Sequence, residues 1–413
     1  MFKSKRKLRW RLDTLSNLDE INFSSNSKGG ALIFSGNDLT VNNSYFWENK
    51  ANYGSGIASN EAFLNENTQI VIVINSHFFR QDSISTSMFY LSPFKKKVFF
   101  FLSNNNVFDN NAYDYDGTAI EVFVNSNSSV FSFNNSFGYN IANTGGIFYD
   151  TVGTGRFFFS NNLYFQNKLA AYLIDSGGVI MSSLQASFSL AAFERYYKNK
   201  GADGLFAVFS SYFSEYKSIY LENISLISIF AFLSFSEFLQ QGSYLLNNVV
   251  NKISCYVMRD YTTLKMEGCV VKNCSSLIRE DGSMILLNFN IRSLILNCIF
   301  INNSFQKESS IEISSNIFES SFQNCKFVGH DIQHSLIFIF ESNYTLINSY
   351  FFKNNGSIFD FISSDFFLNN IFILFQSAKL LNSLFDVKNC QVAKIIGIYS
   401  FKLEIKLIRL FLS

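Results

Sequence analysis

Proline, histidine and charged residues are scarce in this sequence. Its 413 residues include 1 proline and 3 histidines, and charged residues make up 16%. With proline nearly absent, turns must depend on Asn and Gly, which favour them through local hydrogen bonds or positive φ. The net charge of +1 argues against a nucleic-acid-binding protein, which needs a concentrated basic face. The one basic run, at residues 3–11, could touch phosphate or an anionic membrane, but we interpret it as a solvated tail.

Long hydrophobic runs are also missing. The best candidate is ISLISIFAFLSFS at residues 224–236, which contains four serines. It is shorter than the roughly 18–20 apolar residues that a membrane span needs, so we interpret it as a buried strand. The N-terminal basic run is followed by LDTLSNLDE and not by the apolar region of a secretory signal. We therefore expect no membrane span and see no signal peptide.

Phenylalanine, asparagine and serine are abundant. The chain has 50 Phe, aromatics reach 17% and hydrophobic residues 48%, which excludes global disorder. Much Asn beside much Phe indicates many short strands joined by many tight turns. The stretch NNSYFWENKANYGSG at 42–56 is typical, with short apolar bursts separated by turn residues.

An internal repeat organises these bursts. Its first copy is Phe23-Ser-Ser-Asn26 followed by Gly29-Gly30-Ala31-Leu32. Further copies begin at Phe46, Phe108 and Phe137, weaker ones at Phe165 and Tyr196, and one without the glycines at Phe78. The second half keeps the front of the unit in Asn297-Cys-Ile-Phe300, Asn324-Cys-Lys-Phe327, Asn348-Ser-Tyr-Phe351 and Asn382-Ser-Leu-Phe385.

A period of about 20–30 residues predicts an all-β fold, a single-stranded right-handed parallel β-helix of about 14 coils with three strands per coil. Stacked coils would turn the asparagines into a ladder of shared amide bonds and place the glycines at corners. A leucine-rich repeat, the main rival, needs regular Leu spacing and a Pro or helical return. The aromatic residues predicted to point inward are Phe46, Phe108, Phe137, Phe300, Phe327 and Phe351.

Four regions follow from the repeat pattern. We expect a basic tail or cap at 1–20, glycine-containing repeats at 21–210, glycine-poor repeats at 211–395, and a C-terminal strand or end at 396–413. Because each coil of a solenoid contacts only its neighbours, the two repeat regions should be separable.

The F-x-x-N and G-G-A-[ILV] halves of the unit resemble the repeats of polymorphic outer membrane proteins, within the pectin-lyase-like β-helix group. Phe23–Asn26 with Gly29–Leu32 matches both halves. The resemblance is specific from about residue 21 to 206 and general beyond. It implies a cell-surface or extracellular module for adhesion or display, although neither a signal peptide nor a C-terminal membrane barrel is evident. A fragment or a divergent copy would explain both departures.

The six cysteines all lie in the second half. Cys298 and Cys325 take the place that Ser349 and Ser383 take in sister repeats, which indicates buried, stacked thiols. A disulfide and a metal site are the alternatives, but a C-x-x-C pair typical of structural zinc is missing.

Other polar motifs give no catalytic, cofactor or metal residue. His330 and His334 in GHDIQH follow a strand, so we expect them in a solvated turn. Asp109, Asp114 and Asp116 could supply calcium ligands, but we interpret them as a polar turn. The catalytic constellations of the pectin hydrolases are missing.

Nine N-x-[ST] sequons permit glycosylation without showing it. Three of them, at Asn42, Asn134 and Asn302, precede a ladder asparagine and are expected to be hidden.

The sequence therefore predicts a non-catalytic β-helix protein with an adhesion, display or structural role. Its expected partner is a carbohydrate or a protein at the cell surface. The alternative is a carbohydrate-active enzyme, a polysaccharide lyase or glycoside hydrolase, which only the fold supports.

Overall fold

The computed structural model describes residues 16–19, 22–24, 31–34, 38–53, 55–59, 68–91, 97–112, 118–122, 128–142, 147–150, 155–169, 178–183, 188–201, 204–276, 283–305, 309–374, 385–388, 393–401 and 409–411. All regular structure in these residues is β-strand. The chain divides into two compact units, Met1–Phe213 and Ser214–Ser413, and β27 (Tyr212–Tyr216) crosses their boundary.

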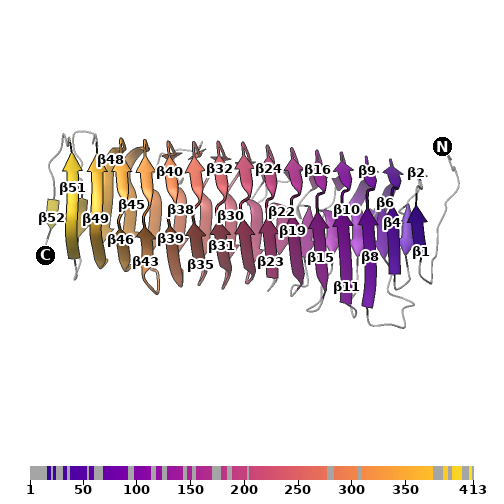
Figure 1. The fold of residues 1–413 in the computed structure, drawn as a ribbon, viewed down its shortest axis with the longest axis horizontal. Helices are drawn as coiled ribbons and strands as arrows, with labels where there is room; N and C mark the ends of the chain where they lie inside the picture. The colour runs from indigo at the N-terminus through magenta and orange to yellow at the C-terminus, as the bar shows by residue number, and fades with distance from the viewer. Residues whose placement is uncertain are drawn as a thin grey trace. The chain divides into compact units, whose positions relative to one another are not determined.

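In the first unit, short strands recur in four rows, and each strand pairs in parallel with its counterpart one coil later (Figure 1). Row 1 contains β1 (Ser16–Asp19), β4 (Asp38–Asn42), β8 (Thr68–Ile74), β11 (Lys97–Ser103), β15 (Ser129–Phe133), β19 (Arg156–Ser160) and β23 (Phe188–Ala192). Row 2 contains β2 (Asn22–Ser24), β5 (Tyr45–Trp47), β9 (His77–Phe79), β12 (Asn106–Phe108), β16 (Ser136–Gly138), β20 (Leu163–Phe165) and β24 (Arg195–Tyr197).

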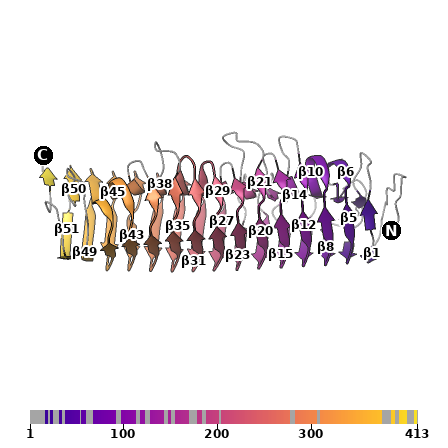
Figure 2. The same cartoon turned by 90° about the horizontal axis from the view of Figure 1, so that it is seen from above.

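Rows 3 and 4 of this unit form a second sheet, seen with the first in Figure 2. Row 3 contains β6 (Lys50–Tyr53), β10 (Asp82–Leu91), β13 (Asn111–Ala112), β17 (Ile141–Ala142), β21 (Lys168–Leu169) and β25 (Lys200–Gly201). Row 4 contains β3 (Leu32–Phe34), β7 (Ile57–Ser59), the end of β10, β14 (Thr118–Val122), β18 (Phe148–Asp150), β22 (Gly178–Ser183) and β26 (Gly204–Phe209).

The second unit has the same four rows. Row 1 contains β31 (Glu237–Gln241), β35 (Thr263–Glu267), β39 (Arg292–Leu296), β43 (Ser320–Gln323), β46 (Tyr344–Ile347), β49 (Phe366–Leu374) and β51 (Ala393–Phe401). Row 2 contains β28 (Ile219–Leu221), β32 (Tyr244–Leu246), β36 (Val270–Lys272), β40 (Ile299–Ile301), β44 (Lys326–Val328), β47 (Tyr350–Phe352) and the end of β49.

Its remaining strands complete the coils. Row 3 contains β29 (Ile224–Ser225), β33 (Val249–Val250), β37 (Ser275–Ser276), β41 (Ser304–Phe305), β45 (Asp331–Phe340) and β48 (Asn355–Ile362). Row 4 contains β30 (Ser228–Leu233), β34 (Ser254–Arg259), β38 (Ser283–Asn288), β42 (Ser309–Ser314), the ends of β45 and β48, β50 (Phe385–Lys388) and β52 (Arg409–Phe411).

An all-β parallel solenoid is therefore confirmed. The predicted count of about 14 coils is not confirmed. Many coils contain four short strands where three were predicted, since the chain bends between rows 1 and 2 inside one sheet. The region boundaries at 20, 210 and 395 stay predictions. The segment predicted to be a buried strand contains β29 and the buried β30. Among the described residues, no helix could cross a membrane.

The bends explain the abundance of Asn. At the corner between rows 1 and 2, one residue per coil has positive φ, including Asn75, Asn104 and Asn134. Asn tolerates this left-handed conformation better than most residues because its short side chain hydrogen-bonds locally. The next corner also has one positive-φ residue per coil, such as Glu48 and Arg80. Among the described glycines, positive φ occurs outside the predicted Gly pairs, at Gly242, Gly268, Gly329 and Gly397.

A buried amide ladder follows the second corner, as predicted. Asn110 Nδ2 donates to Asn140 Oδ1 at 2.8 Å, Asn140 Nδ2 donates to Asn167 Oδ1 at 2.9 Å, and Asn167 continues to Asn199 at 2.9 Å. Each amide thus satisfies a neighbour in the interior, where an unpaired polar group would cost about 1–3 kcal/mol.

The aromatic core rows are confirmed at five of the six predicted positions: Phe46, Phe137, Phe300, Phe327 and Phe351 are at most 1% exposed. Within the second unit, Phe327 stacks on Phe300 at 5.0 Å and on Phe351 at 4.9 Å. The prediction for Phe108 is wrong.

Strand register explains the error at Phe108. Val107 pairs with Phe137, while Phe108 pairs with Gly138. Successive side chains of a strand point to opposite faces, so Val107 fills the interior and Phe108 lies half-buried outside. The same shift places Tyr164 inside and Phe165 outside.

Candidate binding surface

The outside of the first unit has an aromatic pair on β5. Tyr45 and Trp47 flank the buried Phe46, and alternation points both outward, about 7 Å apart along the strand. Each is 49% exposed. One side of Tyr45 stacks on His77 at 4.6 Å, and Trp47 makes an edge contact with Phe79 at 5.2 Å. We call these two half-exposed rings the aromatic platform.

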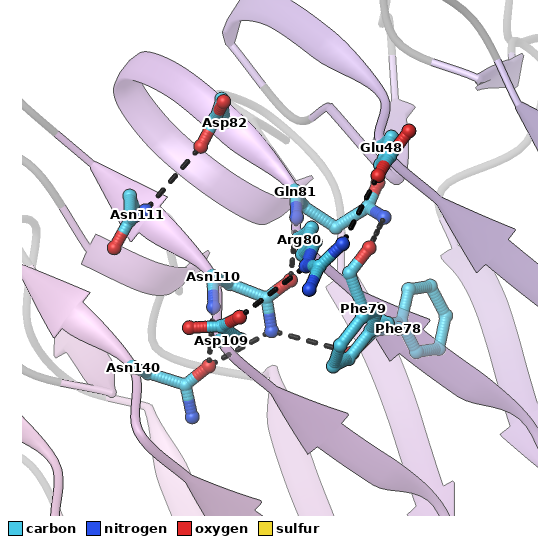
Figure 3. A network of polar contacts seen from close by, with 10 residues as sticks. All are labelled: Glu48, Phe78, Phe79, Arg80, Gln81, Asp82, Asp109, Asn110, Asn111 and Asn140. Atoms are coloured by element: carbon cyan, nitrogen blue, oxygen red, sulfur yellow. Dashed lines mark hydrogen bonds and ion pairs between the residues drawn. The ribbon is translucent and has the colours of Figure 1, made fainter.

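Charged residues follow the platform in the sequence, at the next corner. Figure 3 shows Glu48, Arg80, Asp82 and Asp109. Arg80 lies between Glu48 and Asp109, with its Nη1 3.3 Å from Glu48 Oε1 and its Nε 3.5 Å from Asp109 Oδ2. Lys50 Nζ lies 3.2 Å from Asp82 Oδ2. We call Glu48, Lys50, Arg80, Asp82 and Asp109 the charged corner. The strand register produces it, because residues that follow equivalent strands stack one coil apart.

The charged corner is exposed and internally paired. The side chains of Arg80, Glu48 and Asp109 are 53%, 50% and 50% exposed. Hydrogen bonds from Trp47 and Arg80 lower the pKa of Glu48. Glu48 is therefore held ionised, which suits ion pairing and does not suit a general acid, whose carboxyl must be protonated.

Row 1 of the first unit carries a second outward feature, the apolar face. Its middle line pairs Ile72, Phe101, Phe131, Phe158 and Leu190 in register across β8, β11, β15, β19 and β23. These side chains are half-buried or exposed. The lines beside it mix apolar and polar side chains. One contains Ile70, Phe99, Ser129, Arg156 and Phe188, and the other contains Ile74, Ser103, Phe133, Ser160 and Ala192.

The sequence analysis missed both surfaces. The sequence feature that could have revealed them is a strand in which the inward-facing and the outward-facing positions are both hydrophobic, such as Phe99-Phe100-Phe101-Leu102 in β11. A strand with one solvated face should alternate, so such a run means that the outer face is apolar too. Tyr45-Phe46-Trp47 gives the same signal in the repeat unit.

The predicted polar motifs are mostly dispersed. Asp109 belongs to the charged corner, whereas Asp114 and Asp116 lie outside the described residues. The prediction of a solvated His330 is wrong, because this residue is 1% exposed. His330 occupies a place in the amide ladder, and its Nε2 lies 3.1 Å from the carbonyl oxygen of Phe300. The side chain of His334 lies outside the described residues.

Two of the sequon predictions are also wrong. Asn134 and Asn302 are exposed, because each is the positive-φ corner residue and the residue after it, Asn135 or Asn303, turns inward. Asn42 is half-buried. Among the described sequon asparagines, Asn223 does lie in the buried ladder and donates to Asn248 Oδ1 at 3.0 Å.

The thiols lie as predicted. Cys298 and Cys325 are buried, free and follow one another at the same corner, and Ser349 Oγ accepts the backbone N–H of Cys325 at 3.3 Å. Burial raises the pKa of Cys325 to about 12, which makes this thiol inert at neutral pH. Cys255, Cys269 and Cys274 are also free and buried. In the described part of the chain, no group of His, Cys, Asp and Glu could hold a metal ion.

A carboxyl also lies in the interior of the second unit. Glu215 is 1% exposed. Tyr220 Oη donates to its Oε1, and Gln240 Nε2 donates to its Oε2 at 2.7 Å. Burial raises the pKa of Glu215, while these hydrogen bonds lower it. The hydrogen bonds satisfy the carboxyl within the core and give it a structural role.

A scan against protein-family models matches none of them, and no curated protein matches the chain.

Proposed function

We propose that this chain is a non-catalytic β-solenoid module that binds a carbohydrate or protein partner at a cell surface, in an adhesion, display or structural role. The observation that carries the proposal is the half-exposed pair Tyr45 and Trp47 beside the charged corner. Tyr, Trp and Arg are the residues most often found to dominate binding energies. The repeat resemblance to polymorphic outer membrane proteins points to the same role.

The composition of the charged corner supports a neutral or mixed-charge partner. Two cations, Lys50 and Arg80, stand beside three anions, Glu48, Asp82 and Asp109. Their near balance favours neither a polyanion nor a polycation. Their exposed donors and acceptors suit the hydroxyl groups of a sugar or the polar rim of a protein interface.

Binding would be measured on an array of neutral and acidic glycans and on immobilised cell-surface proteins. We expect Tyr45→Ala with Trp47→Ala to weaken binding about 30-fold or more, the loss of a hot spot. Tyr244→Ala is the matched control, because Tyr244 is 46% exposed and begins β32 as Tyr45 begins β5. Equal weakening by the control, or an unchanged affinity of the double variant, would contradict the proposal.

The enzyme alternative has its own readout. Glycoside hydrolases use two carboxyl groups, of which one must act as an acid. Carboxylates and a basic residue do meet in the charged corner, so the same glycans would be incubated with wild-type protein and assayed for new reducing ends. Cleavage that Asp109→Asn abolishes would establish the enzyme and overturn the proposed module.

A further inference from the structure

The apolar face is the outer surface of a sheet and has hydrophobic side chains along its whole middle line. Its middle line runs through Phe101, Phe131 and Phe158, with aliphatic residues at both ends. Soluble proteins expose single apolar residues widely, but a contiguous apolar patch usually marks an interaction site. Phe188 and Leu190 are 38% and 36% exposed, so the patch reaches solvent at its edge.

Ring geometry limits what can bind there. Phe101 and Phe131 stack with centroids 4.5 Å apart and planes 3° apart, and Phe131 and Phe158 stack at 4.9 Å and 9°. The rings therefore cover one another's faces and present their edges outward. A sugar or a nucleic-acid base needs an open ring face to stack on, which Phe131 lacks because Phe101 and Phe158 cover both of its faces. A small ligand needs a concave pocket. An extended apolar surface suits these ring edges better.

We propose that the apolar face pairs with the same face of a second copy of this chain, forming an isologous dimer. Two sheets pack well face to face at about 10 Å when both inner faces are apolar. Five strands about 4.8 Å apart and three outward positions about 6.8 Å apart give a face of about 480 Å². Two such faces bury about 960 Å², less than the roughly 1,200 Å² of a stable specific interface, so the dimer we propose is a weak one.

Charges at the ends of the strands select the orientation. Lys97 and Arg156 are exposed at the start of β11 and β19, and Asn104 and Asn134 are exposed just past the ends of β11 and β15. A two-fold axis along the strands would bring Lys97 of one copy near Arg156 of the other, and like charges repel. An axis across the strands makes them antiparallel and places Lys97 beside Asn104 of the partner copy, whose amide oxygen can accept its hydrogen bond.

Sedimentation equilibrium of the full chain tests the proposal. We expect masses between 47.2 kDa and twice that value, increasing with concentration. Phe131→Asp should weaken dimerisation about 30-fold or more. Leu294→Asp is the control, because Leu294 has the corresponding outward, half-buried place on β39 in the second unit. A second variant, Ile72→Lys, tests the same face at one end of its middle line if the first fails to fold.

Three results would overturn the proposal. These are a monomer at every concentration up to about 100 μM, a dimer that Leu294→Asp weakens as much as Phe131→Asp does, and a monomer that binds phosphatidylcholine vesicles through Phe131. Orientation has a separate test, since Lys97→Cys with Asn104→Cys should cross-link two copies in antiparallel packing. Failure of the glycan and protein arrays would leave these outcomes unaffected, because Tyr45 and Trp47 lie in row 2, off the apolar face.

Discussion

Acid should destabilise the second unit through one buried side chain, His330. Its ring takes the place that Asn303 and Asn354 take in neighbouring coils. Those two asparagines donate from Nδ2 to the carbonyl oxygens of Val271 and Phe327. His330 Nε2, 3.1 Å from the carbonyl oxygen of Phe300, makes the equivalent hydrogen bond. The ring can do so while neutral, with its proton on Nε2.

Protonation of this ring is unfavourable in the folded state. The Nδ1 atom is buried and makes no hydrogen bond with any described residue. Burial lowers the pKa of His330 from 6.5 to about 4, although the backbones of Phe300 and Asn303 act in the opposite direction. The nearest carboxylate in sequence, Asp331, is exposed and accepts a hydrogen bond from Asn355. A second ring proton would therefore place an uncompensated charge in the core.

The sign and the magnitude follow from proton linkage. A histidine with a depressed pKa in the folded state contributes its full stability above pH 6.5 and loses it as the pH falls toward 4. A difference of about 2.5 pKa units corresponds to about 3 kcal/mol. This loss is a large part of the 5–15 kcal/mol typical of a whole domain.

Urea unfolding between pH 7.5 and pH 4 would measure the effect. His330→Asn restores the ladder amide without a titratable ring, so we expect this variant to lose about 3 kcal/mol less than wild type over that range. His77→Asn is the control, because His77 is only half-buried and lies in the other unit. Identical losses in wild type and His330→Asn would refute the reasoning.

Three more predictions concern the interior and the strand register. Because burial raises the pKa of Glu215, the stability of wild type relative to Glu215→Gln should be greatest at low pH and fall as the pH rises through the pKa of the folded state, as urea titrations would show. Phe137→Ala should cost about 3–5 kcal/mol in thermal unfolding, and Phe108→Ala less than half of that, because only the first ring fills the core; equal costs would contradict the observed register. Gly138→Ala should cost about 1–3 kcal/mol, because a Cβ there would lie 2.3 Å from Cζ of Phe165, and an unchanged melting temperature would contradict this contact.

The repeat made the fold predictable. Asn and Phe recur once per coil because every coil needs a turn at the same corner and an aromatic side chain at the same place in the core. The buried amide ladder and five of the six inward phenylalanines could therefore be predicted from the spacing. The stacked thiols followed from the same alignment, since Cys298 and Cys325 replace Ser349 in sister repeats. The repeat period and each residue's position in the repeat unit were sufficient to predict these features.

Register at single-residue resolution was not predictable in the same way. Asn106-Val107-Phe108 matches the repeat when its phenylalanine is aligned with Phe137, yet the strand pairs Val107 with Phe137. Both alignments place a hydrophobic residue inside, and the two differ only in packing against neighbouring coils. A shift of one residue turns every side chain to the other face. When successive residues of a strand are all apolar, the sequence does not show which of them point inward. The same apolar residues, where they point outward, produce the apolar face.

The two outer surfaces of the first unit have different consequences for how it interacts. The charged corner holds its ions in pairs and keeps polar atoms in solvent, so it can exchange water for a polar partner at little cost. The apolar face has an aromatic and aliphatic middle line, with Arg156 and three serines on the lines beside it. Its gain on binding comes mainly from removing ring edges from water. Because Trp47 lies on β5 of row 2 and Phe131 on β15 of row 1, each surface can be altered without changing the other.

A dimer would then present two charged corners, and binding to a surface with many identical sites should become tighter than binding of a monomer. Comparing Phe131→Asp with wild type on sparse and dense immobilised partner would reveal that difference, and equal affinities at both densities would show that the two surfaces act separately.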